Sequence, residues 1–392
     1  MKLPSYREML AALVAAPSVS STDPALDQPN RPVIDLLAGW AESVGARVEI
    51  EPVDEARGKY NLLATLGEGE SGLLLGGHVD TVPCDPDRWH SDPWRLREEG
   101  GRYYGLGATD MKGFFPLVLE LMARVDAASL RRPLVLLATA DEESTMAGAR
   151  LLDGVRLPAS HAVIGEPTDL APVFMHKGIM MESLRLTGRS GHSSNPALGV
   201  NAIEGMHEVI GALLHWREQL AGKWSDERFE VPVPTLNLGV IHGGDNPNRI
   251  CGECELQFDL RLLPGMDLAE LERDLARLAA DAVAGTGLKM ELQPLFEGVP
   301  AHRADPDGEL LQALVELSGR PAKSVAFGTE APFLAGMGLE AVVFGPGSID
   351  QAHQPDEYLE ISRTEECRTV LAGVVERFCT RGPEAGRRAG HG

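Results

Sequence analysis

Aromatic residues and long apolar runs are both scarce in this chain of 392 residues. Phe, Trp and Tyr make up 5% of the sequence, and no apolar stretch approaches the roughly 20 residues that a transmembrane helix requires. Residues 1–7 lack the apolar core of a secretion signal. We therefore expect a cytoplasmic protein that has no membrane partner.

Basic residues are also few. There are 36 Lys and Arg against 58 Asp and Glu, so the formal net charge is -22. A surface of this sign repels phosphates, which argues against a nucleic-acid partner or an anionic membrane. A cationic substrate is compatible with the charge, and so is a solvated acidic surface that only aids solubility. The charge by itself does not separate these two interpretations.

The five cysteines argue against a disulfide framework. Their number is odd and no secretion signal precedes them, so we expect reduced thiols. Cys251 and Cys254 form a CxxC pair, but the sequence has no second pair to complete a four-thiolate zinc site. We interpret this pair as the opening of a strand.

What the chain does have is an alternation of short apolar runs with helix-like stretches. Continuous apolar runs are typical of strands that are buried on both faces. Their alternation with helices predicts βαβ units and a mainly parallel sheet, which is an α/β fold. The expected strands lie at 61–66, 73–76, 134–138 and 162–165, and the expected helices lie at 114–125 and 147–152.

The pattern changes to half-exposed, alternating strands after this region, which predicts an inserted α+β domain. Its strands are expected at 179–187, 235–241 and 253–263, and its helices at 200–219 and 268–284. The α/β pattern returns afterwards with a strand at 341–344. We predict a discontinuous first domain of residues 1–178 and 293–380, an inserted domain of residues 179–292, and a disordered tail of residues 381–392.

Five short segments carry acidic residues and histidines, and most of them follow an apolar run that ends in a turn. They are residues 76–80, 107–113, 140–144, 164–167 and 350–355. An open α/β sheet builds its site at the carboxyl ends of its strands. Together the segments predict a pair of bridged metal ions and hydrolysis by a metal-activated water.

His78 and Asp80 lie two apart in an extended segment, so their side chains point to the same side. We predict His78 as a ligand and Asp80 as the group that fixes its tautomer, although such a triplet also occurs in ordinary turns. Asp110 lies among glycines, which let the backbone approach an ion closely, and its two oxygens suit a bridge between cations. Asp110 is also suited to cap the helix expected near Lys112.

Glu142 and Glu143 would repel each other after a buried strand unless a cation balanced them. We expect one of them to bind metal and the other to accept a proton from water. The first turn of a helix also favours glutamate, which is the alternative. Glu166 and His353 follow further strands and complete the set of candidate ligands.

These segments resemble the M20 family of dinuclear zinc amidohydrolases and peptidases, and the resemblance covers nearly the whole chain. It implies two Zn²⁺ ions per chain, with Co²⁺ or Mn²⁺ as possible substitutes. One zinc would be held by His78, Asp110 and Glu166. The second would share Asp110 and be completed by Glu143 and His353.

The resemblance also implies roles for residues that do not bind metal. Glu142 would be the general base and Asp80 would orient His78. The inserted domain would form a homodimer and close over the cleft as a lid. His192, within Ser-Gly-His-Ser at 190–193, would reach the partner subunit's site and stabilise an oxyanion; taken alone, it is a loop histidine.

The finer similarity is to the branch of the family that deacetylates acetylornithine. It rests on segments 139–143, 174–178, 243–245, 248–251, 259–261 and 328–333. Residues 328–331 read Gly-Thr-Glu-Ala, where the branch acting on succinyl-diaminopimelate typically carries Gly-Thr-Ser-Asp. The similarity implies removal of the N2-acetyl group from acetylornithine to give ornithine and acetate, a step of arginine biosynthesis.

Four residues are candidates for contacts with this small acylated amino acid. Asn248 and Arg261 would bind its α-carboxylate, since the guanidinium fork matches a carboxylate; a turn residue and a strand ion pair are the alternatives. Glu330, beside Thr329, would meet its δ-ammonium, unless it only caps a helix. Related hydrolases acting on succinyl-diaminopimelate, acetylcitrulline, other acyl-amino acids or dipeptides stay open, as does a non-catalytic metal-binding protein of this fold.

Overall fold

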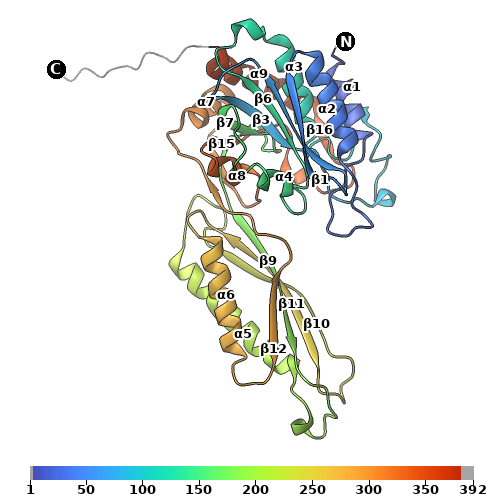
Figure 1. Ribbon diagram of the computed structural model, residues 1–392, viewed down its shortest axis with the longest axis vertical. Coiled ribbons are helices and arrows are strands. Elements are labelled where there is room, and N and C mark those ends of the chain that lie inside the picture. Colours follow the sequence, from blue (N-terminus) through green and yellow to red (C-terminus); the bar gives the residue numbers. More distant parts are fainter. Residues whose placement is uncertain (1–2, 381–392) are drawn as a thin grey trace, which may run out of the picture. The chain divides into compact units, whose positions relative to one another are not determined.

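The computed structural model describes residues 3–380, so the tail predicted to be disordered lies outside the described residues. The chain divides into two compact units, which can be followed by colour along the sequence in Figure 1. The first unit contains residues 3–174, 304–323 and 329–380, and the second contains residues 175–303 and 324–328. The domain boundaries predicted from the sequence, at 178/179 and 292/293, stay predictions.

The first unit is built on a mixed sheet whose four central strands are parallel. Antiparallel strands extend the sheet on either side. In spatial order the strands of this unit are β1 (Arg47–Asp54), β2 (Lys59–Leu66), β6 (Leu134–Thr139), β3 (Gly72–His78), β7 (Ala159–Ile164), β15 (Glu340–Val343) and the start of β8 (Val173–His176). Strands β3 and β6 are buried along their whole length, and β7 and β15 end in buried apolar residues, as expected for parallel strands covered on both faces.

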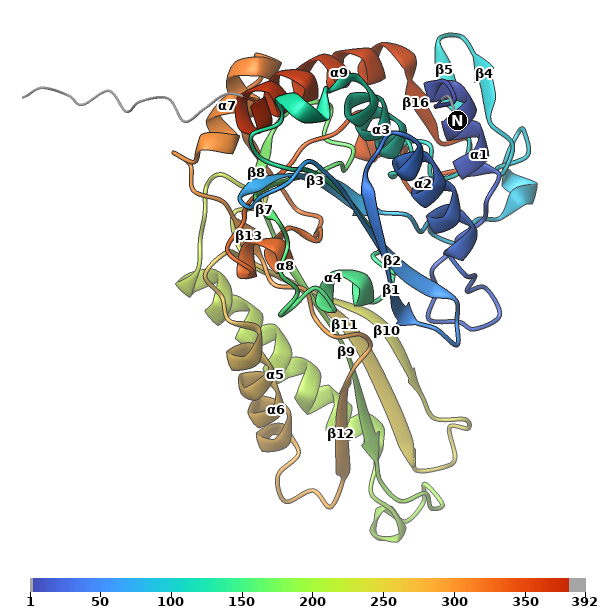
Figure 2. The same ribbon diagram turned by 45° about the horizontal axis from the view of Figure 1, so that its top comes forward.

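Helices cover both faces of this sheet, as in other doubly wound folds. In Figure 2, α1, α2, α3 and α9 lie on one side and α4 and α8 on the other. Helix α3 is buried around almost its whole circumference, which marks a helix enclosed by the core. The bounds are α1 (Tyr6–Val14), α2 (Arg31–Ser43), α3 (Phe114–Arg124), α4 (Ala147–Arg150), α7 (Glu309–Ser318), α8 (Ala331–Gly336) and α9 (Ile361–Val375).

A small antiparallel sheet in the same unit connects two distant parts of the chain. Its strand order is β16-β5-β4, and Tyr358 pairs with Tyr104. This pairing places the segment that follows His353 beside the segment that leads to Asp110. The strands are β4 (Arg97–Glu99), β5 (Arg102–Tyr104) and β16 (Tyr358–Glu360).

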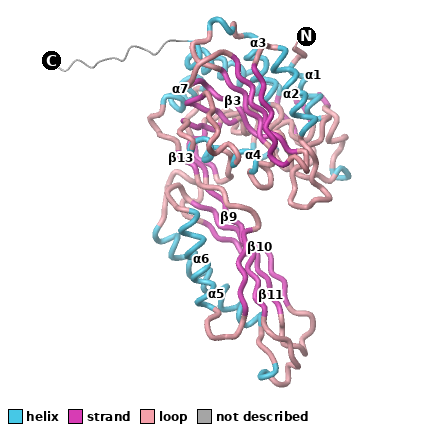
Figure 3. Tube along the Cα trace, in the orientation of Figure 1, coloured by secondary structure: helices cyan, strands magenta, loops and turns pink. Residues whose placement is uncertain are grey.

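The second unit is an antiparallel sheet with two helices side by side on one face (Figure 3). Buried and half-exposed residues alternate along β9 and β11, as expected for a sheet covered on one face only. The strand order is β10 (Thr235–Gly243), β11 (Glu253–Leu262), β9 (Gly178–Thr187) and β12 (Lys289–Pro294), and the helices are α5 (Ala202–Lys223) and α6 (Leu268–Ala282). Two short strands, β13 (His302–Arg303) and β14 (Lys323–Val325), pair with β8.

The expected fold class is confirmed by this α/β unit and the inserted α+β segment. Each strand and helix predicted above overlaps an observed element, with ends that differ by a few residues. Within residues 3–380, no helix combines the length and the apolar character needed to cross a membrane.

Candidate metal centre

Three neighbouring parallel strands end at one edge of the sheet, and the candidate ligands follow directly from them. His78 is the last residue of β3 and pairs with Thr139, the last residue of β6. Glu142 and Glu143 follow β6 in a turn, and Glu166 comes shortly after β7. Because parallel strands present their carboxyl ends together, residues far apart in the sequence meet here.

The carboxylate of Asp110 lies between two histidines. Its Oδ1 is 3.1 Å from His78 Nε2, and its Oδ2 is 3.3 Å from His353 Nε2. A second carboxylate accompanies each histidine. Glu166 Oε1 is 3.8 Å from His78 Nε2, and Glu143 Oε1 is 3.1 Å from His353 Nε2. The structure thus forms two half-sites, each with one histidine and one glutamate, that share Asp110.

The cluster holds more negative charge than its own histidines can balance. Burial raises the pKa of Glu166 and of Glu142 well above the usual value, and neighbouring carboxylates add to the effect. Hydrogen bonds with Asp110 and Glu143 raise the pKa of His353 to about 10. Burial alone would lower the pKa of His78, but the hydrogen bond with Asp110 and nearby acids raise it well above 6.5. Such a site attracts positive charge, and a divalent cation would supply it.

Buried oxygens without a hydrogen-bond partner support the same conclusion. In the described part of the chain these include Asp80 Oδ1, Glu166 Oε1 and Glu330 Oε1, all around this cluster. Buried polar atoms are normally paired, so their concentration here points to a bound group. His78, Asp110 and Glu143 each offer a ligand atom within 4.8 Å of the others. Imidazole and carboxylate donors fit zinc, and also cobalt or manganese.

Asp80 contacts the site differently from the expectation. His78 Nδ1 is 3.1 Å from the main-chain carbonyl of Asp80 but 3.7 Å from its carboxylate. The other carboxylate oxygen, Oδ2, accepts a hydrogen bond of 3.0 Å from the backbone N–H of Glu143. Asp80 therefore lies against His78 with both its carbonyl and its carboxylate, and its side chain also holds the Glu143 turn in place.

A buried lysine anchors the turn that carries Glu142 and Glu143. Asp141 has a φ of 57°, which a non-glycine residue adopts only at a cost. Its Oδ1 is 2.7 Å from Nζ of the fully buried Lys59, which also contacts Asp27 at 2.9 Å. This ion pair holds the turn in its conformation, and the turn lies before helix α4 begins.

Two alternatives from the sequence are excluded by the local structure. Helix α3 begins at Phe114 after Gly113 and has no side-chain cap, so Asp110 does not cap it. Glu142 and Glu143 precede α4 and so do not belong to its first turn.

Glu330 is buried beside this cluster and does not act as a helix cap. Its side chain makes no capping hydrogen bond at the start of α8, whereas Thr329 Oγ1 accepts one of 3.1 Å from the N–H of Ala331. Burial raises the pKa of Glu330 to about 7, against a hydrogen bond from Thr139 and the charge on His78, which both lower it.

The other three predicted residues belong to the second unit. His192 is exposed, and its Nδ1 lies 2.8 Å from Ser194 Oγ. The carbonyl of Asn248 accepts a hydrogen bond of 3.0 Å from the N–H of Ser193, so Asn248 and His192 are neighbours. Arg261 binds Asp259 at 2.9 Å.

Most of β11 separates Asn248 from Arg261 along the chain. Asn248 lies in the loop before this strand, and Arg261 lies near its end. The part of β11 between Glu253 and Arg261 spans roughly 26 Å at about 3.3 Å per residue.

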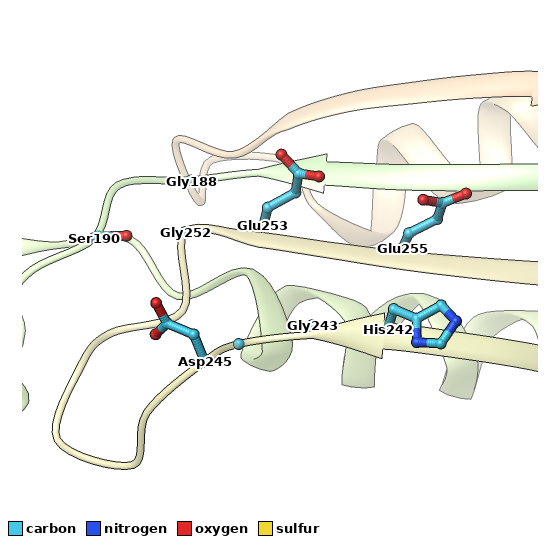
Figure 4. Close-up of a pocket in the computed structure, with 9 residues that line it drawn as sticks. Gly188, Ser190, His242, Gly243, Asp245, Gly252, Glu253 and Glu255 are labelled. Atoms are coloured by element: carbon cyan, nitrogen blue, oxygen red, sulfur yellow. The ribbon is translucent and has the colours of Figure 1, made fainter.

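A cavity in the second unit also gathers acidic residues and a histidine, but it is not a metal site. Its volume is about 500 Å³, and it is lined by His242, Asp245, Glu253, Glu255 and several glycines of the second unit. Figure 4 shows these residues. The acids are already compensated, because Arg185 lies 3.0 Å from Glu255 and 3.8 Å from Glu253. This cavity lacks the shared carboxylate of the metal centre.

Two residues that shape the centre were missed by sequence reasoning, namely Lys59 and Glu357. Nothing in a sequence marks a lysine as fully buried, and Lys59 reads as an ordinary residue at the start of a strand. The one available signal for Glu357 was its position, because it is an acid four residues after the predicted ligand His353.

The fold and the acid-and-histidine cluster define a metal-dependent hydrolase that acts on amides. A model of the peptidase family M20/M25/M40 matches residues 74–377. The chain therefore belongs to this family.

Curated relatives extend over nearly the whole chain. An acetylornithine deacetylase of Pasteurella multocida is 46% identical over 380 residues, which cover 97% of this chain and 99% of the relative. One of Klebsiella pneumoniae is 48% identical over 378 residues, covering 96% and 98%.

Solved structures with low sequence identity share the fold. A metallo-carboxypeptidase of the M20 family from Sulfolobus solfataricus has a TM-score of 0.74 at 17% identity and covers 96% of this chain and 99% of its own. A dinuclear metal-binding peptidase of the M20 family from Bacillus subtilis has a TM-score of 0.66 at 15% identity, covering 95% and 98%.

Proposed function

We propose that this enzyme hydrolyses the N2-acetyl amide of acetylornithine to acetate and ornithine with two zinc ions. The observation that carries the proposal is the carboxylate of Asp110, which faces His78 with one oxygen and His353 with the other. The relatives that share almost half of the sequence over its full length are named for this activity. They favour acetylornithine over the other acyl-amino acids that the metal centre alone would allow.

The proposed ligands follow the two half-sites. His78, Asp110 and Glu166 hold one ion, and Asp110, Glu143 and His353 hold the second. Bound there, the two ions would polarise the amide carbonyl and lower the pKa of a water toward about 7. Glu142 accepts a proton from the attacking water and delivers it to the leaving amine.

The enzyme is further proposed to act as a homodimer in which His192 contributes to the partner subunit's site. Its exposed position in the second unit is compatible with such a reach. Large apolar side chains are exposed in the same unit, namely Leu198, Ile203, Val240 and Ile241, and a second copy would cover such surface. The cytoplasmic location stays a prediction.

The function is tested by comparing substrates in metal-defined buffer. We expect kcat/KM to be higher for acetylornithine than for acetylcitrulline or succinyl-diaminopimelate. The difference from acetylcitrulline, whose side chain is neutral, should be at least about tenfold, because a buried acid paired with the δ-ammonium contributes about 1.5–3 kcal/mol. A higher kcat/KM for either rival would reassign the substrate. No hydrolysis of any of the three by the zinc-loaded protein would remove the proposal.

The proposed contact between Glu330 and the δ-ammonium has its own test. The Glu330→Gln variant should lose about tenfold or more in kcat/KM for acetylornithine, since its amide cannot neutralise the ammonium. Acetylcitrulline, which is neutral at this position, serves as the internal control and should be affected much less. Equal losses for both substrates at unchanged metal content would show that Glu330 does not read the side-chain charge.

A further inference from the structure

Glu357 is a buried carboxylate that accepts three backbone hydrogen bonds from the loop carrying Asp110. Its Oε2 accepts from the N–H of Gly107 at 2.8 Å. Its Oε1 accepts from the N–H of Thr109 at 2.7 Å and from the N–H of Asp110 itself at 3.0 Å. Only 2% of Glu357 is exposed, so water cannot replace these bonds.

The contacts of Glu357 continue along the main chain. Its carbonyl accepts a hydrogen bond of 3.1 Å from the N–H of Gly105, and the hydroxyl of Thr109 donates to the carbonyl of Tyr358. The pairing of Tyr358 with Tyr104 extends the same contact. The loop before Asp110 is therefore bound along its length to the segment that follows His353.

This arrangement links the loop that carries Asp110 to the segment that follows His353, and both residues are proposed metal ligands. Asp110 must direct one oxygen to each half-site, and a small rotation of its backbone would move both oxygens at once. Gly107 lies in this loop with a φ of 75°, a conformation that favours glycine. The three bonds to one carboxylate hold the backbone around it and so restrict that rotation.

We propose that Glu357 is a positioning residue that holds the Asp110 carboxylate between the two half-sites and thereby sets the affinity for both metal ions. It touches neither substrate nor metal and acts through the backbone of the bridging aspartate. The inference rests on the proposed metal-dependent function but not on the identity of the substrate.

A purely structural role is the competing explanation, and Glu340 provides the matched control. Glu340 also receives backbone N–H groups in the first unit, but it caps helix α7. Its oxygen accepts from Leu310 at 3.0 Å and from Leu311 at 3.1 Å, away from the metal ligands. Glutamine at 357 keeps only one of the two accepting oxygens, so a buried N–H loses its acceptor. Glutamine at 340 keeps an oxygen for both N–H groups but removes the negative charge at the start of α7. Both variants should therefore lose stability.

The experiment measures zinc affinity and stability separately in the full-length chain. Apo-protein is titrated with Zn²⁺ against a chromophoric chelator, and urea unfolding of the apo-protein is followed in parallel. Glu357→Gln should bind zinc about 10–100-fold more weakly than the wild type, as for other groups that orient metal ligands. Glu340→Gln should lower the urea midpoint but leave zinc affinity within twofold.

The outcomes are unambiguous for Glu357. Zinc affinity within twofold of the wild type, with a urea midpoint lowered as in Glu340→Gln, would overturn the positioning role. If Glu357→Gln does not fold, the milder Glu357→Asp is measured instead, and the same thresholds of tenfold and twofold apply. Failure of the wild type to bind zinc would reject the proposed function itself, which is a separate result.

Discussion

Replacing Glu142 by glutamine is expected to lower kcat by about 10²–10⁴-fold while both metal ions stay bound. Glutamine keeps the shape of the side chain but cannot accept a proton from water. Glu142 lies at the edge of the metal cluster, where it interacts with the charges of His78, Glu166 and Glu143. It makes none of the close contacts to the two histidines that Asp110, Glu143 and Glu166 make, so metal content should not depend on it.

Kinetics with acetylornithine and metal analysis of the same preparation check this result. Glu142→Asp is the matched variant, because it keeps a carboxylate and should retain more activity than Glu142→Gln. If Glu142→Gln retains two metals and most of the activity, another group is the base. If it loses a metal, Glu142 is a ligand and the assignment of Glu143 must be reconsidered.

The second large effect is expected from His353→Ala, which should reduce bound metal from two ions to one per chain. His353 contributes one of the few donors of its half-site, and its side chain is 52% exposed, so its removal leaves the core intact. Loss of the second ion removes several kcal/mol of transition-state stabilisation, which corresponds to a fall of about 10²–10³-fold in kcat/KM.

His90→Ala provides the control for this experiment. His90 is another exposed histidine that contacts a carboxylate, with Nδ1 at 2.5 Å from Asp356 Oδ2 in the same loop as His353. Its removal should leave two metals bound. Two metals per chain in His353→Ala, measured by mass spectrometry or atomic emission, would show that His353 is not a ligand.

His353 also illustrates why the centre resists prediction from local preferences. Its φ is 58°, a left-handed conformation that costs a non-glycine residue about 1–3 kcal/mol. The contacts of its imidazole with Asp110 at 3.3 Å and with Glu143 at 3.1 Å help to compensate for this cost. Local propensity would disfavour this backbone, so only the assembled loop reveals it.

Much of the architecture followed from simple patterns. The runs at 73–76 and 134–138 are almost wholly apolar, and such runs form strands only when both faces are covered. They correspond to β3 and β6, which are adjacent and parallel. Once these strands are parallel neighbours, the polar residues after them must share one edge, which is why His78, Glu142 and Glu143 were predictable as a group.

The details of the contacts did not follow in the same way. The carboxylate of Asp80, predicted to orient His78, lies 3.7 Å from its Nδ1, and the structure adds contacts of the Asp80 carbonyl with His78 and of the carboxylate with the Glu143 turn. Asn248 and Arg261 stay predicted contacts of the substrate carboxylate; Asn248 lies in the loop before β11 and Arg261 near the end of that strand. Sequence spacing fixes the segment to which a residue belongs, not the atom that it contacts.

The sequence by itself determined the α/β organisation, the inserted segment and the set of acids and histidines at the strand ends. These properties depend on the periodicity of apolar residues and on the turns that follow them, which are local. Only the tertiary structure decided that Asp110 divides its oxygens between His78 and His353 and that Glu357 holds its loop. Those contacts join segments about 250 positions apart, and their geometry depends on how the whole sheet and its loops pack.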